Sequence, residues 1–82
     1  MATLRKRSLL LSGHATSIAL EPEFWAVLDR MAEGRGSSLA SLIVSIDRAR
    51  GERPLASACR VAALTFEQAA RASALAASPV ED

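Results

Sequence analysis

The stretch that decides the fold runs from residue 16 to residue 47 and reads TSIALEPEFWAVLDRMAEGRGSSLASLIVSID. Side chains alternate in character around its start, over residues 15 to 20, which predicts one short, half-buried β-strand. The side of this strand that we expect to face a core carries Thr16, Ile18 and Leu20. The opposite, outward side carries Ala15, Ser17 and Ala19.

Two helices are predicted after the strand. Pro22, flanked by two glutamates, is a helix-start signal because proline tolerates the first helical position and acidic groups there favour the helix dipole. The first helix is expected from about Pro22 to Glu33, and a Gly-Arg-Gly turn ends it. Ser37 and Ser38 offer N-cap oxygens to a second helix that Gly51 ends. The apolar residues of both helices recur at helical spacing, which predicts that they are buried.

The flanks of this stretch differ in character. A third helix is expected from about Leu55 to Ala76, and it is apolar over so much of its circumference that it needs more than one packing surface. Residues 78–82 are expected to form a frayed tail. Gly13 divides residues 8 to 20 into two extended pieces. A single strand cannot satisfy its own backbone hydrogen bonds, so the strand over residues 15 to 20 must pair either with the piece at residues 8–12 or with another copy of the chain.

Length and composition limit the chain to one small domain. Half of its 82 residues are apolar but only three are aromatic, and this apolar content is most simply buried between chains. We therefore expect a homodimer, or a tetramer. A single cysteine excludes a disulfide within one chain, and no apolar run approaches the length of about 20 residues that spans a bilayer, so a cytoplasmic protein is expected.

Charge is distributed unevenly along the chain. Residues 1 to 20 carry Arg5, Lys6 and Arg7 and no acidic residue, giving +3, whereas the remaining 62 residues carry seven Arg and nine Asp or Glu, giving −2. A basic N-terminal arm over residues 1–7 therefore predicts an anionic partner, although a solvated terminus gives the same pattern.

The pattern resembles the ribbon-helix-helix domain, the fold of small dimeric repressors and antitoxins such as Arc and MetJ. The matching features are the short strand, the acidic start of the first helix, the glycine turn and the serine-capped second helix. The segment KRSLLLSGHATSIALEPEFWAVL, residues 6–28, is similar to an uncharacterised bacterial subgroup of these proteins, and LASACRVAALTFE, residues 55–67, extends the similarity. The domain organisation that follows is an arm over 1–7, a core over 8–50, an additional helix over 51–77 and a tail.

The resemblance implies a fold and a mechanism. The fold is mostly α-helical with one strand per chain, and two chains pair their strands into an antiparallel ribbon that enters the major groove of DNA. The expected DNA-contacting residues are Arg5, Lys6, Arg7, Ala15, Ser17, Ala19, Ser37 and Ser38. The expected dimer core comprises Thr16, Ile18, Leu20, Phe24, Trp25, Leu28, Leu42, Ile43 and Ile46.

The outward strand residues depart from this pattern. Alanine offers only an apolar contact to a thymine methyl group, and serine discriminates little between bases, so the strand lacks a side chain for a bidentate base contact. Two functions therefore stay open. The first is a DNA-binding transcriptional regulator, and the second is an oligomerisation or protein-interaction module, antitoxin-like, that docks a partner through the third helix.

Catalysis, a metal site and a cofactor are not expected. The sequence holds no Gly-rich phosphate loop and no cluster of His, Asp and Glu. His14 is the single histidine and is expected to serve a turn beside Gly13, and Cys59 is expected to be a small buried residue.

Overall fold

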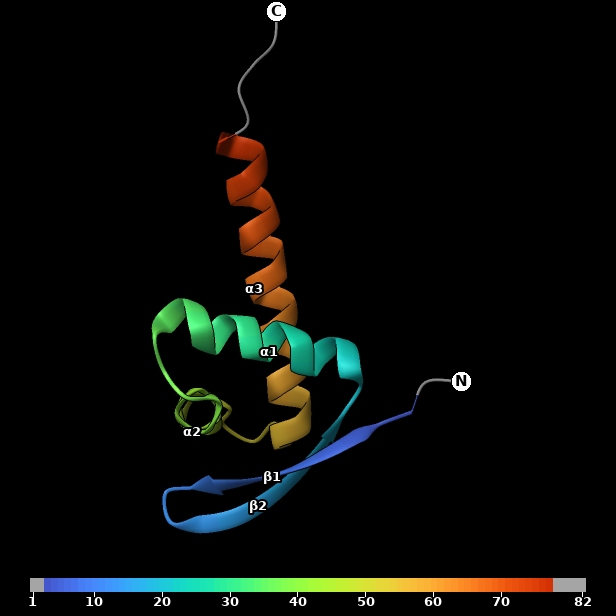
Figure 1. Ribbon diagram of the computed structural model, residues 1–82, viewed down its shortest axis with the longest axis vertical. Helices are drawn as coiled ribbons and strands as arrows, with labels where there is room; N and C mark the ends of the chain where they lie inside the picture. The colour runs from blue at the N-terminus through green and yellow to red at the C-terminus, as the bar shows by residue number, and fades with distance from the viewer. Residues whose placement is uncertain (1–2, 78–82) are drawn as a thin grey trace, which may run out of the picture.

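The computed structural model describes residues 3 to 77 of the chain. Its elements are β1 (Arg5–Leu11), β2 (His14–Leu20), α1 (Pro22–Arg35), α2 (Leu39–Ala49) and α3 (Leu55–Ala77). The two strands form an antiparallel hairpin, and the three helices lie together on one side of it (Figure 1). Helix α3 crosses behind α1 and then extends away from the rest of the molecule (Figure 1).

The number of strands differs from the prediction. We expected one strand per chain, but residues 5 to 11 form a second strand that pairs with β2 inside the same chain, from Arg5 opposite Leu20 to Leu11 opposite His14. Ser12 and Gly13 connect them with φ values of 52° and 85°, the two positive values that a type I′ turn requires. The ribbon is therefore complete within one chain, and pairing between chains is not needed to form it.

The helices begin and end close to the predicted residues, and local signals explain the bounds. Pro22 opens α1. Gly36 ends it in the left-handed conformation, with its N–H donating to the carbonyl oxygens of Ala32 and Glu33. This arrangement places the end of α1 at Arg35, two residues beyond the predicted Glu33. The Ser38 hydroxyl caps α2 by accepting a hydrogen bond of 3.0 Å from the Ser41 N–H.

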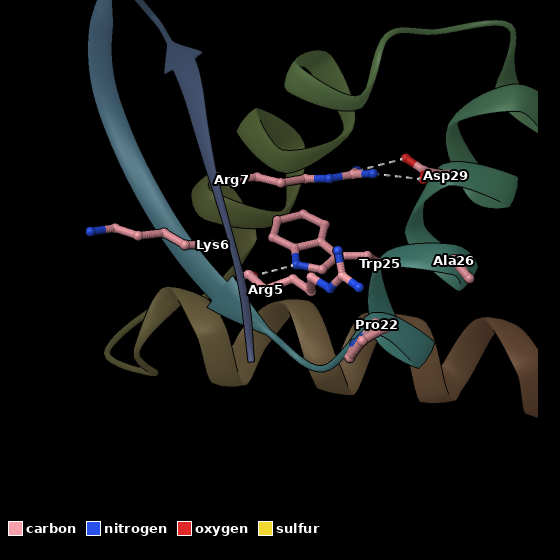
Figure 2. A pocket seen from close by; sticks show the side chains of 7 residues that line it. All are labelled: Arg5, Lys6, Arg7, Pro22, Trp25, Ala26 and Asp29. Carbon is pink, nitrogen blue, oxygen red and sulfur yellow. Dashed lines mark hydrogen bonds and ion pairs between the residues drawn. The ribbon is translucent and has the colours of Figure 1, made fainter. Parts of the chain in front are cut away.

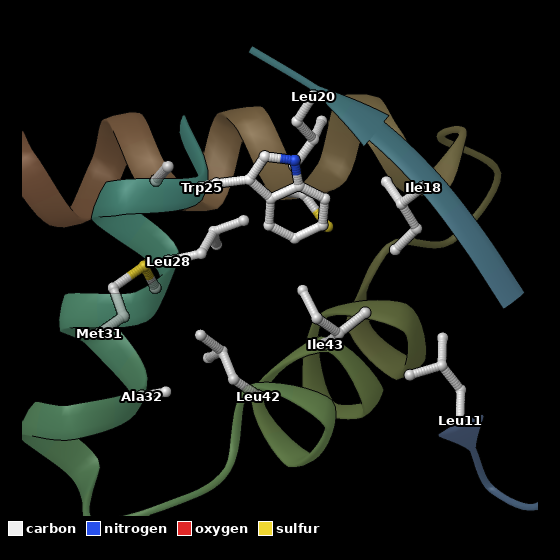
Figure 3. Close-up of a cluster of buried hydrophobic side chains, with 11 residues drawn as sticks. Leu11, Ile18, Leu20, Trp25, Leu28, Met31, Ala32, Leu42 and Ile43 are labelled. Carbon is white, nitrogen blue, oxygen red and sulfur yellow. The ribbon is translucent and has the colours of Figure 1, made fainter. Parts of the chain in front are cut away.

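A single hydrophobic core joins the hairpin to all three helices (Figure 3). The residues expected in a dimer core that are buried within the chain itself are Ile18, Leu20, Trp25, Leu28, Leu42 and Ile43, and those only half-buried are Thr16, Phe24 and Ile46. Cys59 of α3 is fully buried, as expected, and closes this core from the third helix. Most of the expected dimer core is thus covered within the chain, where the hairpin and the three helices pack together, and its part in a dimer stays a prediction.

Helix α3 has two halves with different surroundings. Its first half contacts α1, α2 and β2, and the Arg60 guanidinium donates a 2.9 Å hydrogen bond to Glu21 at the start of α1, which lowers the pKa of that carboxyl group. Residues 68 to 76 are exposed on every side, and alanine, the residue with the highest helix propensity, makes up much of this half. Among residues 3 to 77, no helix has the length and apolar character needed to cross a membrane. The predicted tail, residues 78–82, lies outside the described residues.

Candidate nucleic-acid interface

The outer face of the hairpin is the surface that the resemblance assigned to DNA. Side chains directly opposite each other in the register share a face, so the outer face, turned away from the helices, is made by the pairs Lys6 with Ala19, Ser8 with Ser17 and Leu10 with Ala15. The outward direction predicted for Ala15, Ser17 and Ala19 agrees with their position, since Ala15 and Ser17 are exposed and Ala19 is half-buried.

Two hydroxyl groups meet at the centre of this face. The Oγ atoms of Ser8 and Ser17 lie 3.1 Å apart across the strands, and both are exposed. A hydroxyl group that shares one hydrogen bond keeps further capacity to donate or accept. The centre of the ribbon is therefore shallow and polar, with Lys6 and Ala19 on one side of it and Leu10 and Ala15 on the other.

Arg7, expected to contact DNA, points to the inner face instead (Figure 2). Its two terminal nitrogens lie 3.0 and 3.2 Å from the two carboxylate oxygens of Asp29 in α1, a bidentate ion pair. Its guanidinium carbon also lies 4.8 Å from the centre of the Trp25 ring, within cation–π range. Arg7 thus holds β1 against α1, and its charge is already partnered within the chain.

Arg5 and Lys6 lie at the start of β1, and not in an arm that precedes the ribbon. The Trp25 indole N–H donates a 2.8 Å hydrogen bond to the Arg5 carbonyl oxygen, which fixes this end of the strand (Figure 2). The Lys6 side chain extends away from Trp25, on the other side of the ribbon, whereas the Arg5 side chain lies beside the indole (Figure 2). Both side chains are exposed, so Arg5 and Lys6, unlike Arg7, are free to contact a phosphate group.

The start of α2 was expected to present backbone N–H groups to a phosphate. Ser38 is its N-cap, and the Ser38 hydroxyl also donates to Ser41 Oγ at 3.1 Å. The Ser37 hydroxyl donates to the Ser38 carbonyl oxygen at 3.3 Å. The capping roles predicted for this pair of serines therefore belong to Ser38 alone, and a phosphate contact at this helix start stays a prediction.

A hollow of about 440 Å³ links the turn end of the hairpin to α2. Leu10 and Ser12 line it from the hairpin, and Ser41 and Arg48 line it from α2. Sequence reasoning did not select these residues, because only the pairing of β1 with β2 brings residue 10 and the turn beside this helix. Arg48 is exposed and lies at the opposite end of the ribbon from Lys6, so cations flank the ribbon at both ends.

A metal site would need several His, Cys, Asp or Glu side chains close together. His14 is exposed at the first position of β2, directly after the turn, where a role beside Gly13 was expected. Within residues 3 to 77, no group of three or more His, Cys, Asp and Glu side chains is close enough together to hold a metal ion.

Comparison with known proteins identifies the family of the chain. The family model of the ribbon-helix-helix domain matches residues 4–66, which is well over half of the sequence. The matched range includes both strands, α1, α2 and the half of α3 that contacts the core. No curated protein and no solved structure matched in the corresponding comparisons. With a two-stranded ribbon followed by a glycine-ended helix and a serine-capped helix, this chain belongs to the ribbon-helix-helix domain family.

Proposed function

We propose that the protein is a transcriptional regulator that binds double-stranded DNA through the outer face of its hairpin. Ribbon-helix-helix domains are typically DNA-binding regulators or antitoxins. The observation that carries the proposal is the arrangement of charge around the ribbon: Arg5 and Lys6 lie at one end and Arg48 of α2 lies at the other. Between them, the outer face carries serine, alanine and the exposed Leu10. Cations so placed would meet the phosphates on either side of a groove while the ribbon lies within it.

The shape of the ribbon supports binding in the major groove. That groove is about 12 Å wide and admits a two-stranded ribbon. The small outward side chains of β2 would let the backbone of this strand approach the base edges, and the methyl groups of Ala15 and Ala19 can contact thymine methyl groups.

The pairing of β1 with β2 also changes the expected sequence readout. Lys6 stands opposite Ala19 on the outer face, and a lysine there can donate hydrogen bonds to O6 and N7 of guanine. One such residue gives little discrimination between sites, so most of the affinity should come from phosphate contacts and should fall steeply with salt.

A homodimer in the bacterial cytoplasm is part of the proposal. Members of the family typically dimerise, and a second copy would place a second ribbon on the DNA and double the number of phosphate contacts. Several large apolar side chains stay exposed on one copy, among them Leu10 on the ribbon face at 67% and Leu64 of α3 at 55%. Light scattering should report twice the chain mass, and a monodisperse monomer at micromolar concentration would remove the dimer from the proposal.

The test is a titration of the protein against fluorescent random duplex DNA and genomic fragments at about 50 mM and about 200 mM salt. The wild-type protein should bind at the lower salt concentration and lose at least tenfold in affinity at the higher one. Lys6→Glu should weaken binding at least tenfold, because it reverses the one outer-face charge.

Arg71→Glu is the matched control, since Arg71 is also exposed but belongs to the projecting half of α3. Its affinity should stay within about threefold of the wild type at constant salt. Absence of binding near 50 mM salt, or equal losses in the two variants, would contradict a ribbon-centred DNA site.

A second candidate function is a protein-interaction module, antitoxin-like, and a specific surface favours it. The ribbon face holds few base-reading groups, whereas α3 borders an apolar groove that no strand residue lines. The DNA titration near 50 mM salt would separate the two functions, because a regulator should bind duplex DNA there and an interaction module should not.

A further inference from the structure

A groove runs along α3 on a side of the molecule that the proposed DNA contacts do not use. It consists of two adjoining hollows of about 430 and 330 Å³, one bordered by α2 and the other by α1. Arg35 and Ala62 line both hollows, so the two hollows adjoin along α3. None of its lining residues comes from β1 or β2, so the groove and the outer face of the ribbon are separate surfaces.

The floor of the groove is one continuous stripe of α3. It is formed by residues at helical positions i, i+3, i+4, i+7, i+8 and i+11, namely Ala58, Val61, Ala62, Thr65, Phe66 and Ala69. This stripe is about 17 Å long at the rise of an α-helix, roughly three turns. Three of its six residues are alanines, so a backbone can lie close to it, while Phe66 and Val61 supply larger apolar contacts.

The walls add apolar surface and positive charge. Ile46 of α2 and Met31 of α1 border the stripe, and three arginines (Arg35, Arg50 and Arg53) stand at its rim. No aspartate or glutamate lines either hollow. Arg50 is held by Asp47 at 2.6 Å, but within residues 3 to 77 no ion pair involves Arg35 or Arg53.

We propose that this groove binds an amphipathic α-helix of another protein, one that carries an apolar stripe flanked by acidic residues. An apolar stripe of about three turns, bordered by α2 along one part and by α1 along the other, offers the kind of surface that the helix-in-groove mode of recognition uses. Rim arginines without an acidic partner in the described chain select glutamate or aspartate beside the apolar stripe. The proposal rests on the second candidate function, the protein-interaction module, and deepens it by naming the chemistry of the partner, and it does not depend on DNA binding.

Charge argues against the two other occupants of this surface. If a second copy of the chain covered the groove face to face, the rim arginines of both copies would meet, and like charges in contact disfavour an interface. The phosphates of DNA would pair with the arginine side chains but would not bury the apolar floor. An acidic amphipathic helix satisfies both parts of the surface at once.

The test uses two capped synthetic peptides of about 16 residues, long enough to cover the stripe. The first carries leucine at a and d positions and glutamate at the e and g positions beside them, and the second replaces each glutamate by lysine. Isothermal titration against the full chain should show binding of the glutamate peptide and at least tenfold weaker binding of the lysine peptide. No binding of the glutamate peptide, or equal binding of both peptides, would overturn the proposal.

Matched variants on α3 locate the binding. Val61→Glu places a charge on the groove floor and should reduce the affinity for the glutamate peptide at least tenfold. Leu64→Glu makes the same kind of change three residues away, outside the lining of the groove, and should keep wild-type affinity. Both positions are exposed, so neither change removes a buried core residue. Equal effects of the two variants would overturn the proposal.

A charge swap and a mass measurement complete the test. Arg53→Glu should lower the affinity for the glutamate peptide and raise the affinity for the lysine peptide, each by a factor of at least three. Unchanged affinities would contradict the role of the rim arginines. If the wild-type protein is a dimer and the Val61→Glu variant is a monomer, the groove is covered by a second copy and the proposal fails. Lys6→Glu should leave peptide binding unchanged, so a failure of DNA binding and a failure of peptide binding can be told apart.

Discussion

Lys6 and Arg7 are neighbours in sequence but lie on opposite faces of β1. Lys6 points outward beside Ala19, whereas Arg7 reaches inward to Asp29 and Trp25. A run of three basic residues, which as sequence indicates one solvated arm, is therefore divided by the strand into groups with different surroundings. The positions of Asp29, 22 residues further along the chain, and of Trp25 explain why an arginine stands on the inner face.

This division predicts that two alanine substitutions affect different properties, stability for Arg7→Ala and DNA binding for Lys6→Ala. Arg7→Ala should lower the free energy of unfolding by about 1 kcal/mol, because the ion pair is 41% and 46% exposed and solvent screening keeps its contribution, together with the cation–π contact, modest. Lys6→Ala should change stability by less than about 0.5 kcal/mol but should weaken DNA binding. Urea denaturation and DNA titration of both variants provide the check, and a more destabilising Lys6→Ala would contradict these placements.

Cys59 predicts a change of stability at alkaline pH. Burial raises the pKa of its thiol from the ordinary value of 9.0 to about 11, with a smaller contribution in the same direction from Asp47. Because the folded-state pKa lies above the unfolded one, the stabilisation is fully present below pH 9 and is lost as the pH rises through about 11.

The measurement is urea denaturation between pH 8 and pH 11, with Cys59→Ala as the comparison. The wild-type protein should lose more stability across this range than the variant does. The native thiol should also react slowly with a thiol reagent at pH 8, because it is buried and protonated. Parallel pH profiles of the two proteins, or rapid labelling of the native protein, would show that the thiol is not in this environment.

At the scale of elements, the helices were more predictable than the hairpin. Proline, serine and glycine signals place the ends of α1 and α2 within about two residues, since each acts through local backbone chemistry. Strand β1 was expected only as an extended piece over residues 8–12 whose pairing stayed open, because its sequence, RKRSLLL, begins with a charged run that was interpreted as an arm and alternates less cleanly than β2. The register with β2 extends this alternation toward the N-terminus, because Arg7 shares the inner face with Leu9 and Leu11.

The hairpin turn gives a direct test of the intrachain ribbon. Gly13 has a φ of +85°, so Gly13→Ala should destabilise the protein by about 1 kcal/mol, because a side chain makes this conformation unfavourable. Ser12→Asn should instead stabilise it by about 0.5 kcal/mol, since Asn-Gly is the favoured pair for a type I′ turn. Thermal denaturation of both variants at one protein concentration measures the two effects. If neither substitution changed the melting temperature, residues 12 and 13 would not form this turn.

At the scale of the whole molecule, composition predicted burial but not where it occurs. The apolar content was expected to be covered by a second chain, whereas the first half of α3 covers much of it within one chain. The outward strand residues were identified correctly because a period of two fixes their direction, but the hollow beside Arg48 and the groove along α3 depend on how separate elements meet. The spacing of residues along a sequence does not specify how separate helices and strands pack against one another.

The central claim is that DNA lies on the outer face of a ribbon formed within one chain. It is tested most directly by titrating isotopically labelled protein with a short DNA duplex and following each backbone amide by NMR. The largest shifts should fall on Lys6, Ser8, Ala15, Ser17 and Ala19, with weaker shifts at the start of α2 and none along the α3 groove. Shifts that concentrate on Val61, Ala62 and Phe66, or an unchanged spectrum near 50 mM salt, would contradict the account.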